Sequence, residues 1–510
     1  MPAPAALGRP FGAAAVEGGV EFRVWAPNAA RAVVRVGTRD HDLILAGAGV
    51  WEATVEAGAG DDYLYLLDGQ AWPDPCSRFQ PEGVRGPSQV VDPSRFSWTD
   101  AGWNGVALDE LVVYELHVGT FSDQGTFDGV ITYFDGLREL GVTAVELMPV
   151  ATFPGERGWG YDGVYAYAPH PAYGGPDGLA RLVDAAHAAG LGVLLDVVYN
   201  HVGPGSEAID AFGPYFTSRF HTFWGDAINY AEDGVREWAI QNACMWVRDY
   251  HVDGLRLDAT HAIFDERPQH VLAELAERVH AERPQALVIS EAAVGDLRPI
   301  EAWGHDAQWA DELHHHLHVL LTGERDGYYA DYGSGAGLAE QFGRRPADRL
   351  VVCSQNHDQV GNRALGDRPA AGELAIRAAV LLFAPETPLL FMGEEYGERR
   401  PFQFFTDHID PAIIEATCEG RRREFESFTA FSGEDIPDPQ DAGTFRRSKL
   451  SHQGDPELRD LYRELISLRR DLPREAEARW DEGARTLAVR RGDVTLVADF
   501  AAKTAEIRRG

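Results

Sequence analysis

The run DGLRLDATHA, residues 253–262, places two charged side chains in an apolar segment with strand-like alternation. In a β-strand alternate residues point to the same side, so Arg256 and Asp258 share one face while Leu255 and Leu257 take the other. A charged pair on one face of a buried strand indicates that the end of this strand presents a functional group.

Apolar runs of the same kind recur along the chain and alternate with segments of helical periodicity, such as residues 178–190 and 269–282. The strand-like runs are residues 111–118, 144–150, 191–200, 252–259, 286–293, 349–358 and 388–395. Near-continuous apolar strands separated by helices predict a parallel sheet buried on both faces. We expect residues 306–321 to supply an eighth strand, so a closed (β/α)8 TIM barrel is more economical than the alternative, an open doubly wound sheet.

Short alternating runs flank this region on both sides. Residues 20–66 have the pattern of a β-sandwich, and residues 485–510 alternate again after a helical segment. We therefore expect an N-terminal β-sandwich (immunoglobulin-like) domain over residues 1–100, a catalytic barrel over 101–472 and a short C-terminal β module over 473–510.

The composition limits the class of partner. A formal net charge of -34, from 46 basic and 80 acidic residues, disfavours nucleic acid and anionic membranes as partners, since both attract basic surfaces. No apolar run approaches the roughly 20 residues of a membrane helix, and the first residues lack the features of a secretory signal. A cytoplasmic location is the expectation.

Polar side chains follow four of the strand-like runs. They are Asp196, Asn200 and His201; Arg256, Asp258 and His261; Glu291; and Asn356, His357 and Asp358. Each alone could cap a helix or lie at the surface. In a parallel barrel, however, the loops after the strands converge over one mouth, so jointly these groups indicate a shared cleft with catalytic chemistry.

Glycoside hydrolysis is the chemistry that needs such a set, because one carboxyl protonates the leaving oxygen and another attacks the anomeric carbon. Asp258 is the expected nucleophile, held ionised by Arg256, since a nearby cation lowers a carboxyl pKa. Glu291, in the apolar context VISEAAV, is the expected proton donor, because such surroundings raise a carboxyl pKa. A separation of about 5 Å would predict retention.

The remaining groups fit a sugar substrate. Asp358 is expected to stabilise positive charge in the transition state, with His201 and His357 bonding sugar hydroxyls. Tyr161 and Trp224 are expected to stack on pyranose faces, whereas most other aromatic residues belong to the core.

Two other motifs are discounted. The histidines of HHHLH, residues 314–318, point in different directions on a helix and cannot jointly bind one metal ion. The glycine-rich YGGPDG, residues 173–178, lacks phosphate-loop spacing and is expected to be a turn before a helix. No cofactor is implied.

Four segments, DVVYNH (196–201), GLRLDATH (254–261), ISEA (289–292) and NHDQ (356–359), resemble the four signature regions of the α-amylase superfamily of retaining glycoside hydrolases, family 13. Longer blocks, among them DAQWADELHHHLHVLLTGE and NHDQVGNRALGDR, most resemble the malto-oligosyltrehalose trehalohydrolases, over most of residues 10–470. The resemblance implies cleavage of the α-1,4 bond next to a terminal trehalose unit, with malto-oligosyltrehalose and related α-glucans as substrates.

Carried over by motif, the resemblance implies that Asp258 is the nucleophile, Glu291 the proton donor and Asp358 the transition-state stabiliser. It places Arg256, His201 and His357 around the bound sugar, with Asp196 as support. Three further segments match regions that contact oligosaccharide in the family, and their candidate residues are His261, Asp265, Asp311, His314, His315, Gln359 and Asn362.

Two departures from the family pattern are Tyr396, where a Trp is expected, and a shortened C-terminal module. Other readings remain open: a glycogen-branching or debranching enzyme, a non-enzymatic α-glucan-binding protein, and an isomerase that interconverts maltose and trehalose. The non-enzymatic reading predicts the loss of a catalytic carboxyl, and all three carboxyls are present.

Overall fold

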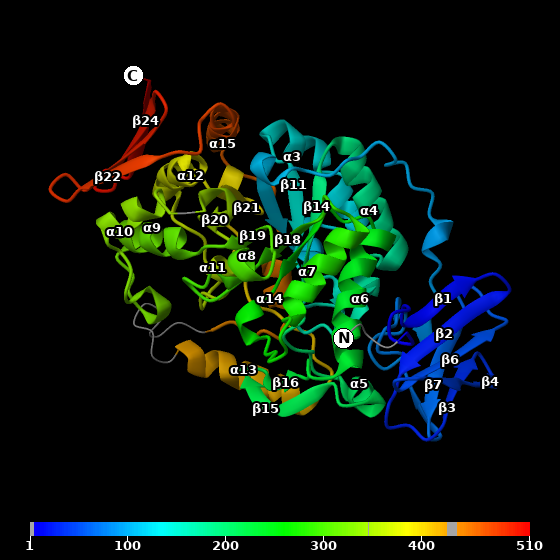
Figure 1. Cartoon of the computed structure of the whole chain (residues 1–510). Coiled ribbons are helices and arrows are strands. Elements are labelled where there is room, and N and C mark those ends of the chain that lie inside the picture. Colours follow the sequence, from blue (N-terminus) through cyan, green and yellow to red (C-terminus); the bar gives the residue numbers. More distant parts are fainter. Residues whose placement is uncertain (1–4, 345, 426–435, 510) are drawn as a thin grey trace.

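The computed structural model describes residues 5–344, 346–425 and 436–509, and in it the chain forms a β-sandwich, a closed barrel and a small sheet in sequence order (Figure 1). The barrel lies in the middle, with the N-terminal sandwich and the C-terminal sheet at opposite ends of the molecule (Figure 1).

The barrel has eight parallel strands, and its last strand pairs with its first. In order they are β10 (Val113–Leu116), β11 (Ala144–Leu147), β14 (Gly192–Val197), β17 (Gly254–Leu257), β18 (Leu287–Ser290), β19 (Ala307–Trp309), β20 (Leu350–Cys353) and β21 (Thr387–Phe391). The closed barrel is thus confirmed over the open sheet, and the eighth strand, β19, comes from residues 306–321 as expected.

Helices surround the strands. They are α1 (Val118–Phe121), α2 (Phe127–Ile131), α3 (Phe134–Leu140), α4 (Gly175–Ala189), α5 (Glu207–Phe212), α6 (Asp233–Asp249), α7 (Val271–Glu282), α8 (Arg298–Ala302), α9 (Glu312–Thr322), α10 (Gly335–Gln341), α11 (His357–Gly361), α12 (Leu374–Phe383), α13 (Pro411–Phe425), α14 (Ala442–Arg447) and α15 (Pro456–Arg470). The predicted turn before a helix is present, but it ends at Gly174, and the last four residues of YGGPDG already belong to α4.

The barrel core explains the alternation in β17. Residues such as Ile289, Trp309 and Cys353 pack together inside the barrel, and the guanidinium of Arg256 lies 4.3 Å from the centre of the Trp309 ring. Leu255 and Leu257 belong instead to the larger core cluster that includes the surrounding helices. Arg256 therefore points inward, and its two leucine neighbours point outward.

The N-terminal domain has two facing sheets. One contains β1 (Gly12–Val16), β2 (Gly19–Trp25), β6 (Val50–Val55) and β5 (Ile44–Gly47), and the other contains β4 (Arg39–Asp42), β3 (Ala32–Val36), β7 (Asp62–Leu67), β8 (Gln70–Trp72) and β9 (Ser88–Gln89). Trp25 lies against α6 so closely that a Cβ added at Gly234 would come within 2.2 Å of its ring. Glycine at this position lets the two domains pack.

Two small hairpins extend from the barrel loops, β12 (Ala151–Thr152) with β13 (Tyr165–Pro169), and β15 (Phe216–Thr222) with β16 (Gly225–Ile228). The C-terminal module is an antiparallel sheet of β22 (Glu477–Asp481), β23 (Thr486–Arg491), β24 (Val494–Asp499) and β25 (Thr504–Arg509). It packs on α10 and α12, so the short module is integrated into the catalytic unit.

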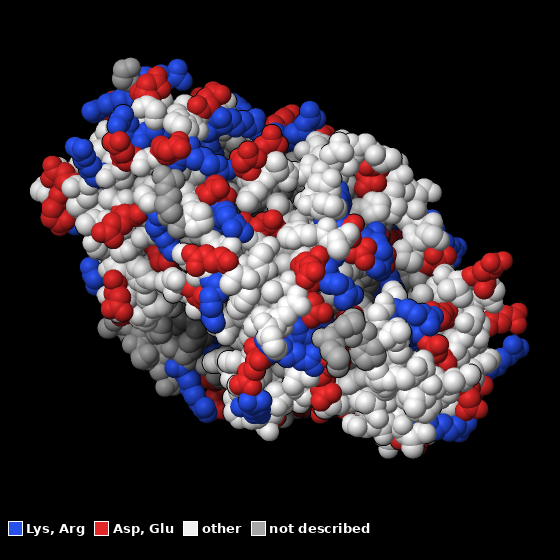
Figure 2. All heavy atoms as spheres, in the orientation of Figure 1, with Lys and Arg blue, Asp and Glu red and all other residues white. Residues whose placement is uncertain are grey.

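The surface mixes charges of both signs. Figure 2 shows Lys and Arg side chains interspersed with Asp and Glu, and on the face in view no basic patch is continuous. Among the helices of the described residues, none combines the length and apolar character that a bilayer crossing requires.

Candidate active site

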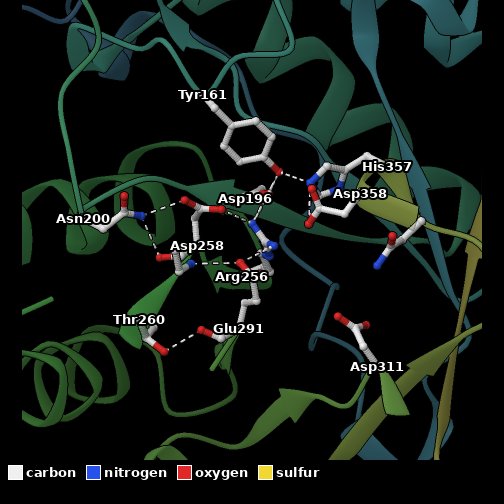
Figure 3. Close-up of polar contacts among 12 residues, drawn as sticks. Tyr161, Asp196, Asn200, Arg256, Asp258, Thr260, Glu291, Asp311, His357 and Asp358 are labelled. Carbon is white, nitrogen blue, oxygen red and sulfur yellow. Dashed lines mark hydrogen bonds and ion pairs between the residues drawn. The ribbon is translucent and has the colours of Figure 1, made fainter. Parts of the chain in front are cut away.

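Arg256 is the centre of a polar cluster at the carboxyl ends of the barrel strands (Figure 3). Its side chain is fully buried. Nη1 donates to Asp196 Oδ2 at 2.7 Å and to Asp258 Oδ1 at 2.8 Å, while Nη2 donates to Glu291 Oε2 at 2.7 Å. One guanidinium therefore fixes three carboxyl groups from three neighbouring strands.

Asp258 follows β17 directly and is buried. Its second oxygen, Oδ2, accepts a hydrogen bond of 2.7 Å from Asn200 Nδ2, which also donates to the main-chain carbonyl of Asp258. Donors on both carboxylate oxygens hold the group in one orientation.

The residue after the nucleophile candidate has an unusual backbone conformation. Ala259 has φ 41°, in the left-handed region that non-glycine residues rarely adopt. This turn directs the Ala259 N–H to Glu291 Oε2 at 2.9 Å, and the N–H of Thr260 to the Glu291 carbonyl at 2.9 Å. Such strain costs on the order of 1–3 kcal/mol and is typical of active sites.

Glu291 has different surroundings from those expected. The expected apolar environment is replaced by charged and polar donors, since Oε2 accepts from Arg256 and from the Ala259 N–H. The side chain is 21% exposed, so it also faces the open mouth of the barrel.

A chain of polar contacts also links Glu115 to Arg256. The carboxylate of Glu115, on β10, accepts from both the main-chain N–H and the ring Nδ1 of His357. His357 Nε2 lies 2.7 Å from the Tyr161 hydroxyl, which donates to Asp196 Oδ2 at 2.6 Å. The chain thus runs from Glu115 through His357, Tyr161 and Asp196 to the central arginine.

The charge state of His357 follows from its neighbours. Burial alone would lower its pKa, but the carboxylates of Asp358 and Glu115 outweigh burial and raise the pKa to about 10. His357 is therefore an imidazolium at neutral pH, with both ring nitrogens donating. Its Nε2 is also 3.5 Å from Asp358 Oδ2.

Two buried carboxyl groups near Arg256 have raised pKa values. Burial raises the pKa of Asp196 to about 7 against the opposing effect of Arg256. Burial also raises the pKa of Glu146, on β11, well above its usual range, and the charge of Glu115 adds to the shift. Glu146 is 1% exposed, and neither of its oxygens has a hydrogen-bond partner in the described part of the chain, so the protonated form is favoured there.

Asp358, on α11, and Asp311, directly before α9, also face the cluster (Figure 3). Asp358 is about one-third exposed, and its Oδ1 accepts from Asn362 Nδ2 at 2.9 Å. Burial and the charges of Glu291 and Asp358 raise the pKa of Asp311 to about 7. Asp311 can thus donate or accept a proton near neutral pH.

The predicted sugar-stacking residues lie beside this cluster. The rings of Trp224 and His201 are parallel at 4.2 Å, and His201 Nε2 is 2.9 Å from the Tyr161 carbonyl. Burial lowers the pKa of His201 to about 4, so its ring is neutral. Trp224 is 49% exposed and is available to a ligand.

Other candidate residues are directed elsewhere. Asp265 forms an ion pair with Arg236 and accepts from the N–H of Val271 at the start of α7. His261 is exposed. His314 contacts the Ser354 carbonyl and the Tyr329 hydroxyl, His315 packs on the rings of Tyr329 and Tyr332, and Gln359 Oε1 accepts from the Tyr329 hydroxyl at 3.4 Å. These contacts account for Asp265, His314 and Gln359 without a ligand, whereas among the described residues Nδ1 of buried His315 has no hydrogen-bond partner.

Sequence reasoning missed Glu115 and Glu146. Each is a single carboxylate within an otherwise apolar strand run, which was a visible signal. In the part of the chain that the structure describes, no group of three or more His, Cys, Asp or Glu side chains could hold a metal ion.

Together these groups provide a buried carboxylate nucleophile, a partly exposed acid, a third carboxyl and an aromatic platform. Paired carboxyls with this environment can protonate a leaving oxygen and attack a sugar carbon without a cofactor.

Comparisons with known proteins agree with this chemistry. Residues 10–91 match the model of carbohydrate-binding module 48 (isoamylase N-terminal domain), and residues 90–221 match the α-amylase catalytic domain. A malto-oligosyltrehalose trehalohydrolase of Deinococcus radiodurans is 44% identical, covering 89% of this chain and 82% of that protein. A malto-oligosyltrehalose trehalohydrolase of Rhizobium sp. (strain M-11) is 43% identical, covering 97% of this chain and 93% of that protein. The crystal structure of a putative α-amylase from Salmonella typhimurium matches with a TM-score of 0.88 at 38% identity, covering 96% of this chain and 92% of that one.

Proposed function

The chain belongs to the malto-oligosyltrehalose trehalohydrolase family, and from this premise we propose that it hydrolyses the α-1,4-glucosidic bond next to the terminal trehalose unit of malto-oligosyltrehalose. The products are trehalose and a malto-oligosaccharide, and the anomeric configuration is retained. The chain is a glycoside hydrolase of the α-amylase superfamily.

The observation that carries the proposal is the shared guanidinium of Arg256. Neighbouring nitrogens of one planar group contact Asp258 and Glu291, which favours the short separation of a retaining pair, about 5 Å, over the wider inverting pair. Asp258 then attacks the anomeric carbon, and Glu291 donates a proton to the glycosidic oxygen as the bond breaks.

The proton of Glu291 is best placed on Oε1, since Oε2 already accepts two hydrogen bonds. Transfer of this proton releases the sugar that departs as trehalose and leaves a covalent glycosyl ester on Asp258. The Glu291 carboxylate next takes a proton from water, the water oxygen attacks the anomeric carbon, and Asp258 is released as a carboxylate.

Asp358 is proposed to stabilise the positive charge that develops on the sugar ring. Imidazolium His357 and neutral His201 hold sugar hydroxyls, while Trp224 and Tyr161 provide aromatic faces. Asp196 keeps Arg256 in place. Asp311 faces the catalytic cluster (Figure 3), and Asn362 donates to Asp358. Both residues are proposed to contact the oligosaccharide.

Five further candidates are proposed to lie near the substrate: His261, Asp265, His314, His315 and Gln359. The internal contacts of the last four support a role in shaping the loops around the substrate.

Product analysis tests the proposed function. With maltotriosyl-trehalose as substrate we expect free trehalose and maltotriose, with little action on maltohexaose or branched glucan. Activity on branched glucan alone would instead assign the barrel to a branching or debranching enzyme, and conversion of maltose to trehalose would indicate an isomerase.

Replacing the nucleophile gives a second test. Asp258→Asn keeps the size of the side chain and one acceptor oxygen but removes the attacking charge, so turnover should fall by at least about 10³-fold while the far-ultraviolet circular dichroism spectrum stays that of the wild type. A variant with full activity would remove the nucleophile assignment.

A further inference from the structure

A cavity of about 230 Å³ lies beside the segment that follows β20. Its lining comes from α9, the segment around α11 and the start of α12, and includes His314, His318, Ser354, Gln355, Gln359 and Arg377. Ser354, Gln355 and Gln359 come after the end of β20 at Cys353, so this part of the lining belongs to the segment that also carries His357 and Asp358.

Several buried polar atoms at this cavity lack a partner. Arg377 is 1% exposed, Ser354 0% and Gln355 2%. Among the residues that the structure describes, Nη1 of Arg377, Oγ of Ser354 and Oε1 of Gln355 have no hydrogen-bond partner, and the same is true of Asp367 Oδ1. A buried polar group without a partner costs about 1–3 kcal/mol, so four of them around one space indicate a polar occupant.

The pattern of donors and acceptors selects the chemistry of that occupant. Gln355 and Asp367 offer acceptors, Arg377 offers a donor and Ser354 can do either. An anion is disfavoured, because Arg377 already pairs with Glu373 at 3.0 Å and Arg363 pairs with Glu324 and Asp367. Arg368 also lines the cavity, and among the described residues its two Nη atoms have no hydrogen-bond partner, but its guanidinium lies 5.0 Å from the centre of the Phe391 ring, which is not part of the lining. Burial also lowers the pKa values of His314 and His318, so these rings favour the neutral form.

Hydroxyl groups both donate and accept, and they satisfy such a mixed set without adding charge. Val360, Pro369 and Ala370 line another part of the cavity and offer an apolar surface to C–H groups. Exposed Thr322 and Ala370 mark its opening to solvent. The volume far exceeds the 10–15 Å³ needed for one water, yet it is below the range of about 300–1,000 Å³ for drug-sized ligands.

We propose that this cavity is a second carbohydrate site that takes one neutral, polyhydroxylated ring of monosaccharide size. The ring would bond to Arg377, Ser354 and Gln355 and rest on Val360 and Pro369. Because Gln355 and Gln359 line the cavity and flank His357 and Asp358 in sequence, a bound ring would contact the segment that carries these two residues. The site is independent of the hydrolytic function proposed above.

Crystals of the full chain with Asp258→Asn, soaked in glucose, test the site directly. The expected result is a pyranose ring in the cavity with hydroxyls on Ser354, Gln355 and Arg377. Ordered water alone in the cavity, at glucose concentrations that fill the barrel mouth, would overturn the proposal. This readout does not depend on which oligosaccharide the enzyme cleaves.

Calorimetric titration of glucose into the same protein, with its active site saturated by maltotriosyl-trehalose, separates the two sites. Glucose binding should persist when the mouth is filled, and loss of all binding would contradict a second site. If maltotriosyl-trehalose does not bind, the proposed hydrolytic function fails, while the soaked crystal still decides the cavity.

Matched variants test which side chains of the cavity contribute to glucose binding. Gln355→Met and, as a second variant, Ser354→Val should each weaken glucose binding by at least tenfold. Gln308→Met is the control, because Gln308 is also buried with an unpartnered Oε1, but it lies on β19 away from the cavity. Equal affinities for the control and both cavity variants would exclude the assigned contacts.

Discussion

At the scale of single residues, the charge on His357 depends on Glu115, which contacts both its ring and its main chain. Asp358, Glu115, Arg256, Glu146 and Asp196 are the charged or titratable groups around this imidazole. Only the carboxylates favour the imidazolium, so removing one of them should make His357 titrate near neutrality.

Glu115→Gln keeps the shape of the side chain and removes its charge. The pKa of His357 should fall from about 10 toward its ordinary value of about 6.5, so activity should decline at a lower pH than in the wild type. In the wild-type protein, folding stability from this proton is present below about pH 6.5 and is lost as pH rises toward 10. In the variant that decline in stability should become shallower.

Rates and urea unfolding measured from pH 5 to 10 check both statements. Glu386→Gln is a suitable control for the rate profile, because this buried glutamate precedes β21, and Arg469 and Arg491 rather than His357 are among the charges that act on it. Superimposable rate profiles for Glu115→Gln and the wild-type enzyme would show that Glu115 does not set the charge of His357.

The sequence predicted the polar residues at strand ends better than those inside strands. Parity and the topology of a parallel barrel are enough to bring Arg256, Asp258 and Glu291 together. The pairing of Glu115 with His357 joins residues 242 positions apart, and local patterns carry no information about such a contact. Asp265 shows the reverse, because its partner Arg236 lies on α6 rather than at the mouth.

At the scale of elements, the loop between β11 and β13 positions Tyr161 through a glycine. Gly160 has φ +104°, and a Cβ added there would come within 2.1 Å of the Pro149 carbonyl oxygen. Only glycine fits this close approach. The Tyr161 hydroxyl, one residue on, bridges His357 and Asp196.

Gly160→Ala should therefore displace Tyr161 and lower kcat/KM by about 10²-fold, the order expected when a small shift misplaces a positioning group. Gly190→Ala is the matched control, because Gly190 also has positive φ (+80°) but would place its Cβ in open space at the end of α4. Both variants should lose about 1–2 kcal/mol of unfolding free energy from backbone strain, and equal kcat/KM values would contradict the positioning role.

The sequence predicted the barrel strands, but it did not predict the conformation of this loop. Apolar runs determine which segments are strands, whereas the path of residues 158–163 depends on contacts with Pro149 and with Phe402, which stacks on Trp159. Such contacts become defined only when the barrel has closed.

At the scale of the whole molecule, Arg491 fastens the C-terminal module to the barrel. It is 1% exposed, and its guanidinium donates to the carbonyls of Pro473, Leu472, Phe383 and Ala384. The C-terminal module is therefore held by buried hydrogen bonds as well as by its apolar face.

Arg491→Met should lower the free energy of unfolding by about 3 kcal/mol, since several buried carbonyls lose their donor, and leave kcat unchanged. Arg490→Met is the control: its side chain, on the same strand, is 56% exposed and pairs with Glu477, an interaction worth at most about 1 kcal/mol. Chemical unfolding and activity assays of both variants check the difference, and an equal loss of stability would argue against this anchor.

The closure of the barrel by β10 and β21 also has a consequence for protein synthesis. Val113 pairs with Leu389, so the first barrel strand cannot complete its pairing until the residues near 390 have emerged from the ribosome. At about 5–20 residues per second, this wait lasts roughly 15–55 s. During that time the nascent chain exposes an unpaired apolar strand edge next to an N-terminal sandwich that can already have folded, and chaperones that bind such edges should associate with the growing chain in this interval.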